Sequence, residues 1–266
     1  MNKMIKKPEL IEIVLNDICN YKCKMCNIWK NKKIHEICFN DLKKIIFDIS
    51  VFNDTHNSNN NNKITIQFIG GETLLYKDLD KAICYASKLN INTSITTNCS
   101  LLSKQKIIEL SNVGLNHINL SLDSTEKKIH NYLRGNKNSY DHIINAISNL
   151  ETQGKNIRLG INTIINELNL HDLKNISDFA KNTKRIDQIY FIALEKPYNS
   201  NYNNDWRTNS PVSYLWPKDK KIINETFDLL ISQKIKNKKI ENSIGMQRTL
   251  RDWLGLITFL RKKEKK

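Results

Sequence analysis

Residues 17–29 read DICNYKCKMCNIW and place Cys19, Cys23 and Cys26 within eight positions. The whole chain of 266 residues holds six cysteines, so half of them lie in this one segment. In a reducing compartment, clustered cysteines are more often metal ligands or catalysts than disulfide partners. The segment therefore predicts a site that uses three thiolates and has no obvious fourth.

The residues before this segment bear on the compartment. Residues 1–16 carry positive charges but only a short mixed apolar run with a glutamate inside it, and no small-residue cleavage site follows. This pattern is neither a signal peptide nor a membrane span. We therefore expect a cytoplasmic protein without a membrane partner.

The net charge of +15 raises the question of a nucleic-acid partner. Only seven of the 42 basic residues are arginine, and the lysines are spread along every segment. Bidentate contacts to bases and phosphates favour arginine. Specific nucleic-acid recognition is therefore not the favoured interpretation.

Short β-type runs alternate with longer helix-type runs along the chain. Six β-then-α units in series imply parallel strands with right-handed crossovers. We predict an α/β fold, a partial (β/α)6 TIM-like barrel with parallel strands. The expected strands are 10–15, 63–69, 92–97, 117–122, 157–165 and 188–194, and the expected helices are 40–52, 77–89, 103–113, a run through Leu150, 170–182 and 222–235. The Asn-rich stretch 53–63 is expected to form a surface loop.

The three cysteines fall in the loop after the first expected strand, at the barrel end where sites are built. A 4Fe-4S cube held by three thiolates keeps one iron open to a small-molecule ligand. Zinc is the rival, because Cys23 and Cys26 form one ligand pair and His35 and Cys38 form another. Spacing alone leaves both metals open.

Cys19, Cys23 and Cys26 reproduce the CxxxCxxC signature of the radical S-adenosylmethionine (radical SAM) enzymes, which the sequence resembles over about residues 10–194. The resemblance implies that the three thiolates hold a 4Fe-4S cluster whose open iron is chelated by SAM. It implies reductive cleavage of SAM to methionine and a 5′-deoxyadenosyl radical, which abstracts hydrogen from a substrate. An electron donor such as a flavodoxin or ferredoxin is then an expected partner.

Further residues match this family at the expected strand ends. Gly70, Gly71 and Glu72 resemble its GGE motif, which receives the SAM amino group, and a carboxylate suits an amine. Paired glycines let a backbone approach a ligand closely. The other residues that the resemblance assigns to SAM are Thr96, Asn98, Ser121, Asp123 and Arg134, with Arg134 for the SAM carboxylate and with Asn162 and Thr163 also lining the site. Glu72 and Asp123 have a plainer alternative, which is to cap the helices that follow them.

Three positions depart from the family pattern. Met25 stands where an aromatic residue is usual, and its thioether can pack against adenine. Thr73 follows the GGE motif where proline is commoner, and Cys99 stands where glycine is typical. These departures concern the shape of the SAM pocket and leave the cluster ligands intact.

The C-terminal part of the chain bears on the domain division and on the alternative functions. Residues 1–195 are expected to form the core barrel, and residues 196–266 a loop and helical segment that packs on or extends it. The tail resembles that of peptide-modifying members with extra clusters, but no cysteine follows Cys99. A peptide is thus the favoured substrate class. The remaining alternatives are a zinc-stabilised basic RNA-binding module without catalysis and a degenerate barrel that binds a cluster without turnover.

Overall fold

A computed structural model describes residues 8–55, 63–198 and 200–263. Most of the Asn-rich stretch, residues 56–62, lies outside the described residues. Within the described part of the chain, no helix is long and apolar enough to cross a membrane.

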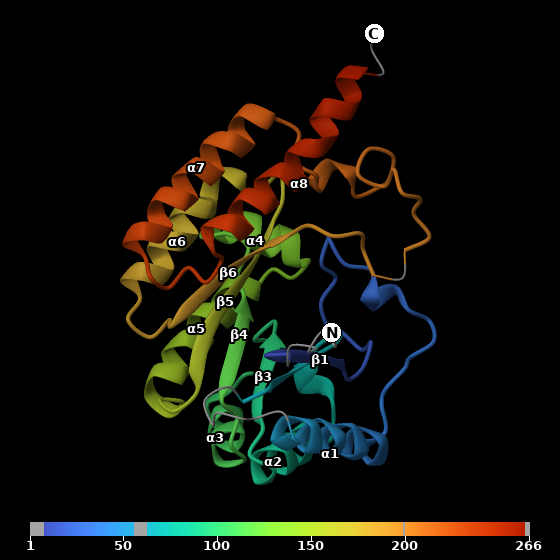
Figure 1. The fold of residues 1–266 in the computed structure, drawn as a ribbon, viewed down its shortest axis with the longest axis vertical. Coiled ribbons are helices and arrows are strands. Elements are labelled where there is room, and N and C mark those ends of the chain that lie inside the picture. The colour runs from blue at the N-terminus through green and yellow to red at the C-terminus, as the bar shows by residue number, and fades with distance from the viewer. Residues whose placement is uncertain (1–7, 56–62, 199, 264–266) are drawn as a thin grey trace, which may run out of the picture.

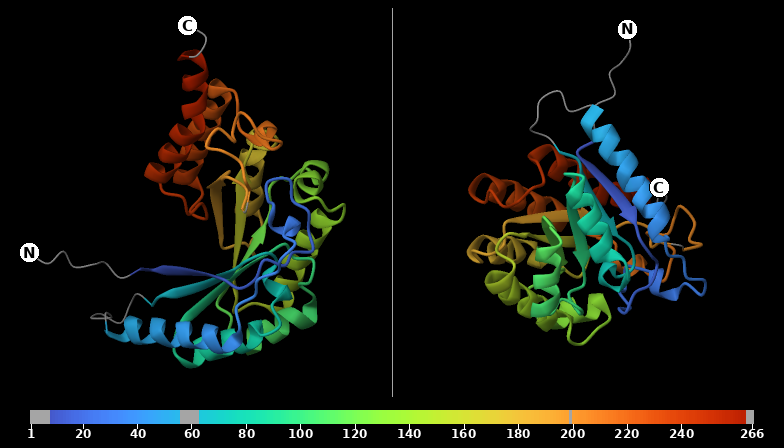
Figure 2. Two further views of the ribbon diagram at one scale, coloured as in Figure 1. Left: turned by 90° about the vertical axis from the view of Figure 1, so that its right-hand side faces the viewer. Right: turned by 90° about the horizontal axis from the view of Figure 1, so that it is seen from below.

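Six strands form one sheet in which every neighbouring pair is parallel and the spatial order equals the chain order. The sheet curls into an open half-barrel (Figures 1 and 2). This confirms the predicted partial (β/α)6 barrel. The strands are β1 Leu10–Val14, β2 Thr65–Ile69, β3 Asn92–Thr97, β4 His117–Ser121, β5 Arg158–Ile165 and β6 Gln188–Ala193.

The connections between strands are helical and pack on the outer face of the sheet (Figure 1). Ser103 starts one of them, because its hydroxyl accepts the Lys106 backbone N–H at 3.1 Å. The helices are α1 Phe39–Thr55, α2 Leu79–Lys88, α3 Lys104–Asn112, α4 Lys127–Arg134, α5 Ser139–Gln153, α6 Leu173–Asn182, α7 Lys220–Lys236 and α8 Ile244–Lys263, with 3-10 turns η1 Ile28–Lys30, η2 Thr73–Leu75, η3 Leu170–Asp172 and η4 Ser213–Leu215.

The two faces of the sheet differ in polarity. Outward residues such as Phe68 and Ile118 are fully buried in the core under the helices, and each such side chain contributes about 2 kcal/mol of burial. The inward face carries polar residues that bond across strands, as Gln67 Nε2 donates to Thr96 Oγ1 at 3.3 Å. A parallel sheet covered on both faces is normally apolar on both. The polar inner face therefore indicates a functional surface rather than a second hydrophobic core.

The last strand is not left as an open edge. Ile189 N–H donates to Lys239 O at 2.7 Å, and Glu241 N–H donates to Ile189 O at 2.9 Å. The Asn242 amide then bonds both the N–H and the C=O of Phe191, at 2.7 and 2.8 Å, as a backbone would. The segment 239–242 thus covers this edge of β6, which would otherwise template pairing with another chain.

A cluster of tryptophans joins the loop after β6 to helix α8. The Arg207 guanidinium lies 5.3, 4.7 and 4.3 Å from the ring centres of Trp206, Trp216 and Trp253. Trp206 and Trp216 are almost fully buried, and burial lowers the pKa of Arg207. The cation and the rings attract each other, so this cluster fastens residues 206–216 to α8. The division of domains at residue 195 stays a prediction.

Candidate functional site

A cavity of about 210 Å³ lies at the carboxyl ends of the strands, where the loop after β1 meets the ends of β2 to β5. All the predicted cluster ligands and nearly all the predicted SAM-binding residues line it together. These residues are Cys19, Cys23, Met25, Cys26, Gly70, Gly71, Glu72, Thr96, Asn98, Ser121 and Arg134. The structure thus brings together side chains that are more than a hundred residues apart in the chain.

The loop that carries the cysteines is fixed on one side by the end of β2. Gly71 N–H donates to Asn16 O at 2.9 Å, and Glu72 N–H donates to Ile18 O at 2.7 Å. A Cβ on Gly71 would lie 2.0 Å from Ile18 O, far closer than real contacts allow. Glycine at this position therefore allows two backbones to meet, a role that the sequence alone did not distinguish from approach to a ligand.

The end of α4 fixes the other side of the loop. Lys24 N–H donates to Leu133 O at 2.8 Å. Gly135 ends α4 in the left-handed region, with φ of 60°, and its absent Cβ would lie 2.1 Å from Lys22 O. This is a usual helix end that needs glycine for its backbone angle, and here it also needs glycine for the space. Figure 2 (left) shows the loop lying beside this end of the helix.

Two aromatic residues in the segment 17–29 also hold the loop, and the sequence did not single them out. Trp29 Nε1 donates to Cys26 O at 2.9 Å. The Tyr21 hydroxyl lies 2.6 Å from His142 Nδ1 on α5, and Tyr21 also lines the cavity. Their position within or just after the cysteine motif was the only available signal.

The cysteine thiols lie in a partly buried, desolvating environment. Burial raises the pKa of Cys19, Cys23 and Cys26, and that of Cys23 reaches about 12 although the Arg134 charge opposes the shift. Thiolates form when a metal displaces the protons, so loading of this site releases protons. Three sulfurs around one cavity fit a cube-shaped cluster, in which each thiolate binds a different iron.

The zinc alternative finds no support in the structure. His35 Nδ1 lies 3.1 Å from the buried carboxylate of Asp17, and the exposed Cys38 thiol donates to Asp41. In the described ranges, no three His, Cys, Asp or Glu side chains are placed to hold a single metal ion. The predicted Cys3His set is therefore not assembled.

Glu72 is buried to 1% exposure and accepts three hydrogen bonds. Thr97 Oγ1 and Leu74 N–H donate to Oε1 at 2.6 and 3.1 Å, and Asn98 N–H donates to Oε2 at 2.8 Å. Burial raises the pKa of Glu72, while these bonds and the Arg134 charge act to lower it. Glu72 does cap η2, as the plainer alternative held. A carboxylate has about four acceptor positions, so one remains for an amine in the cavity.

Arg134, which lines the cavity, forms a buried pair with Asp123, which lies behind it. Arg134 Nε lies 2.7 Å from Asp123 Oδ2. Burial acts to lower the pKa of Arg134, but the charge of Asp123 and the bond to Cys23 raise it overall. Asp123 is fully buried and does not line the cavity. It positions the guanidinium, whose other N–H donors can serve a second anion.

His130 completes the support behind this pair. Asp123 N–H donates to His130 Nδ1 at 3.2 Å, and His130 Nε2 lies 2.9 Å from Ser139 Oγ. Burial, reinforced by the Arg134 charge, lowers the pKa of His130 to about 3. The ring is therefore neutral and structural.

The other predicted residues differ in whether their side chains are already engaged in hydrogen bonds within the protein. Asn98 Nδ2 donates to Asn20 Oδ1 at 2.9 Å and so ties β3 to the cysteine loop. The Thr163 hydroxyl donates to Leu122 O at 2.7 Å, which occupies it. Buried Asn162 Oδ1 has no hydrogen-bond partner among the described residues. Neither Asn162 nor Thr163 lines the cavity.

The three departures from the family pattern have structural answers. Met25 is buried and lines the cavity. The Thr73 hydroxyl donates to Thr96 O at 2.8 Å, which anchors the turn without proline. Cys99 is buried beside Glu72 with φ of 69°, in the left-handed region that glycine tolerates best.

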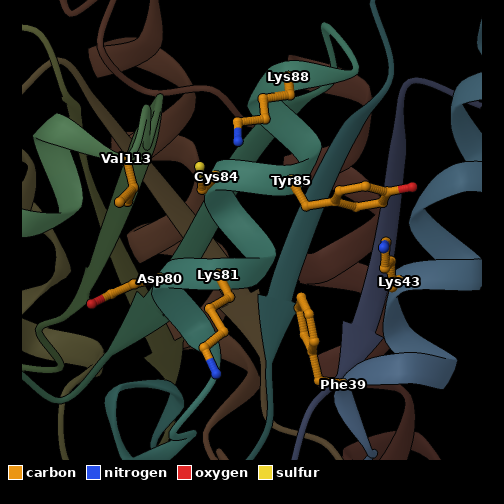
Figure 3. Close-up of a pocket in the computed structure, with 8 residues that line it drawn as sticks. All are labelled: Phe39, Lys43, Asp80, Lys81, Cys84, Tyr85, Lys88 and Val113. Atoms are coloured by element: carbon orange, nitrogen blue, oxygen red, sulfur yellow. The ribbon is translucent and has the colours of Figure 1, made fainter.

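A second cavity, of about 440 Å³, lies on the outer side of α1 and α2 (Figure 3). Its walls include Phe39, Tyr85, Cys84 and the stems of Lys43 and Lys81. It is larger than the cavity at the cysteines, but none of the predicted site residues lines it. The chemistry therefore belongs to the smaller cavity.

Comparisons with known proteins agree with this geometry. Residues 13–180 match the model of the Radical SAM superfamily. The Fe-coproporphyrin III synthase of Methanosarcina barkeri (strain Fusaro / DSM 804) is 29% identical over 179 residues, which are 66% of this chain and 41% of that protein. The GTP 3′,8-cyclase of Campylobacter lari (strain RM2100 / D67 / ATCC BAA-1060) is 34% identical over 138 residues, which are 51% of this chain and 41% of that protein.

Solved structures show the same fold. Streptococcus suis SuiB bound to S-adenosylmethionine superposes with a TM-score of 0.64 at 20% identity, over 85% of this chain and 48% of that one. Native anSMEcpe with bound AdoMet and Cp18Cys peptide gives 0.62 at 19% identity, over 87% and 62%. The chain thus spans less than two thirds of the length of each of these relatives, from 41% to 62%. Because the family model covers more than half of the chain, the protein belongs to the radical SAM superfamily, whose members are enzymes that use a 4Fe-4S cluster and S-adenosylmethionine.

Proposed function

We propose that this chain is the catalytic core of an enzyme that cleaves SAM reductively and uses the resulting radical to abstract hydrogen from a substrate. One observation carries the proposal: three cysteines, a buried glutamate and a buried arginine line a single cavity at the strand ends. Cys19, Cys23 and Cys26 hold the 4Fe-4S cluster. When bound, the cluster supplies one electron to SAM, which then yields methionine and a 5′-deoxyadenosyl radical.

The protein's own residues bind and orient SAM. The free acceptor position of Glu72 receives the SAM ammonium, and Arg134, held by Asp123, receives the SAM carboxylate. Gly70 and Gly71 leave room beside these groups, and Met25 packs against the adenine.

The remaining wall residues exclude water and complete the polar contacts. Thr96, Asn98 and Ser121 present hydroxyl and amide groups to the same cavity. Apolar Ile69 and Ile164 shield it from solvent. A reactive radical needs such a dry wall, because water exclusion prevents side reactions. Binding that holds the substrate hydrogen close to the 5′ carbon then favours its transfer by proximity.

We propose a peptide as the substrate class to test first. The structural neighbours include SuiB bound to the precursor peptide SuiA and anSMEcpe with the Cp18Cys peptide, and the curated relatives include a PqqA peptide cyclase. Other relatives are named for GTP and coproporphyrin. The proposal also includes a cytosolic location, since free thiols persist there, and an external one-electron donor.

The test is formation of 5′-deoxyadenosine by the anaerobically reconstituted protein, given SAM and dithionite. We expect iron and sulfide in the protein and product from the wild type. Cys23→Ala should lose both cluster and product. Cys38→Ala is the matched control, because Cys38 is exposed and lies outside the cavity, and it should behave as the wild type.

Three results would overturn the proposal. They are tightly bound zinc in place of iron, product from Cys23→Ala, and a fully loaded cluster that never turns over with SAM. The last result would identify a degenerate barrel.

A further inference from the structure

The cysteine loop carries a strongly charged surface that the binding of SAM does not use. Between Asp17 and Glu36 the chain has five lysines and no carboxylate. All five are exposed. We name them the lysine collar: Lys22, Lys24, Lys30, Lys32 and Lys33.

The collar lysines form no ion pairs with other described residues, whereas six lysines elsewhere in the described part of the chain do. In the described part of the chain none of the five forms an ion pair. By contrast, Lys106 pairs with Asp80 and Lys174 with Asp178. Unpaired like charges held close together repel each other, so the collar costs stability and is free to meet an anionic surface.

Aromatic and apolar side chains lie among these charges. Lys22 Nζ and Lys30 Nζ lie 5.9 and 5.2 Å from the ring centre of half-buried Trp29. Ile34, in the same segment, is 61% exposed. A tryptophan and an isoleucine ringed by lysines have the make-up of an interface, with an apolar centre and a charged rim.

The collar is joined directly to the cluster ligands. Trp29 donates a hydrogen bond to the backbone oxygen of Cys26 at 2.9 Å, and Lys22 and Lys24 flank Cys23 in the chain. A partner bound on the collar would therefore be separated from the cluster by little more than the cysteine loop itself.

An external electron is needed in the proposed function, on which this inference rests. The 167 residues after Cys99 contain no cysteine, so they offer no thiolates for a second cluster. We propose that the lysine collar is the docking surface for a small acidic electron-carrier protein of the flavodoxin class. The reduced flavin of the carrier gives up one electron and the cluster gains it, so the step balances without another reactant.

The test uses the full chain with its cluster loaded and a purified, negatively charged flavodoxin in its reduced form. The collar variant is Lys30→Glu, Lys32→Glu and Lys33→Glu, positions that lie outside the cavity. The matched control is Lys88→Glu, Lys155→Glu and Lys184→Glu, which makes the same charge change at exposed positions just before β3, β5 and β6, at the opposite end of the sheet.

Two readouts are measured: the dissociation constant for flavodoxin at two salt concentrations, and the rate of cluster reduction by flavodoxin or by dithionite. In the collar variant we expect binding and flavodoxin-driven reduction to fall about tenfold or more, because close charge complementarity sets association rates. Reduction by dithionite should stay unchanged in all variants. Lys30→Arg, Lys32→Arg and Lys33→Arg should keep flavodoxin binding.

The inference is overturned if the collar and control variants lose flavodoxin binding equally, which would reflect net charge alone, or if neither loses it. It is also overturned if a 20-nucleotide RNA binds the collar more tightly than flavodoxin does. Failure of the proposed function gives a different result, because dithionite and SAM would then yield no 5′-deoxyadenosine even in the wild type.

Discussion

Replacement of Gly71 by alanine tests the contact that holds the cysteine loop against β2. The added Cβ would lie 2.0 Å from Ile18 O and 2.4 Å from Ile18 C. These are backbone atoms, so no side-chain rotation can relieve the clash. Gly71 does not lie in the left-handed region, and the cost therefore comes from the contact and not from the backbone angle.

The size of the destabilisation follows from the hydrogen bonds that must break. Moving the two backbones apart breaks the hydrogen bonds from Gly71 N–H to Asn16 O and from Glu72 N–H to Ile18 O, at 2.9 and 2.7 Å. Two lost bonds with groups left unsatisfied cost about 3 kcal/mol. For a chain of this size the melting temperature should fall by roughly 6–12 °C. Iron uptake should fall as well, because the cysteine loop is no longer held in place beside Glu72.

The assay is urea unfolding of the metal-free protein, followed by circular dichroism, together with iron per chain after reconstitution. Gly245→Ala is the matched control, since its added Cβ would meet only Ser243 Oγ at 3.8 Å, near the start of α8. That control should be neutral or more stable by up to about 1 kcal/mol. If Gly71→Ala unfolds like the wild type and binds the same amount of iron, the contact does not hold the loop.

Three further predictions concern the rest of the molecule. Burial, aided by the Arg158 charge, lowers the pKa of His117 from 6.5 to about 4, so the folded state resists protonation and loses stability as the pH falls from about 6.5 toward 4. His117→Gln should remove about 2 kcal/mol of the loss between pH 7 and pH 5 in urea titrations; an unchanged pH profile would contradict the assignment. Cys99 has φ of 69°, so Cys99→Gly should be more stable than Cys99→Ala by about 1 kcal/mol, and the reverse order in urea unfolding would exclude strain. Arg207→Ala should cost about 2 kcal/mol and shift tryptophan fluorescence, because it removes the cation from three rings; Arg207→Lys should keep part of that stability, and equal losses in both variants would argue against a charge effect.

Much of the fold could be predicted because each strand is a short run of β-favouring residues bounded by turns. The predicted strand 92–97 matches β3, and the others differ from the observed strands by one or two residues at an end. The expected single run through Leu150 is two helices, since Gly135 ends α4 before α5 begins. Helix α8 falls within the expected C-terminal helical segment but had no predicted bounds of its own, because its packing against α7 and β6 is a tertiary feature.

The candidate site, like the fold, could be predicted only in part. That polar residues meet at the strand ends follows from parallel topology alone, and so the cavity could be predicted. Which of them faces the cavity could not. Asp123 lies behind Arg134 because of contacts at the ends of β4, β5 and α4, whereas the amide of Asn98 is committed to Asn20 by the path of the cysteine loop. That path depends on contacts with Gly71 and Gly135, which are distant in sequence from the loop.

These contacts explain how the cysteine loop can present three thiols to one cavity. It is bound by backbone hydrogen bonds at β2 and at the end of α4, and each contact requires a glycine, because a Cβ would lie 2.0 or 2.1 Å from a loop carbonyl oxygen. Ordering a residue costs about 1–2 kcal/mol. If the loop were disordered before the metal bound, this cost would reduce the free energy of metal binding. Here the contacts with the barrel order the loop during folding, before any metal binds. The outer side of the loop is then left exposed, and its lysines form no ion pair with any residue that the structure describes, which is the arrangement expected of a surface that receives a partner.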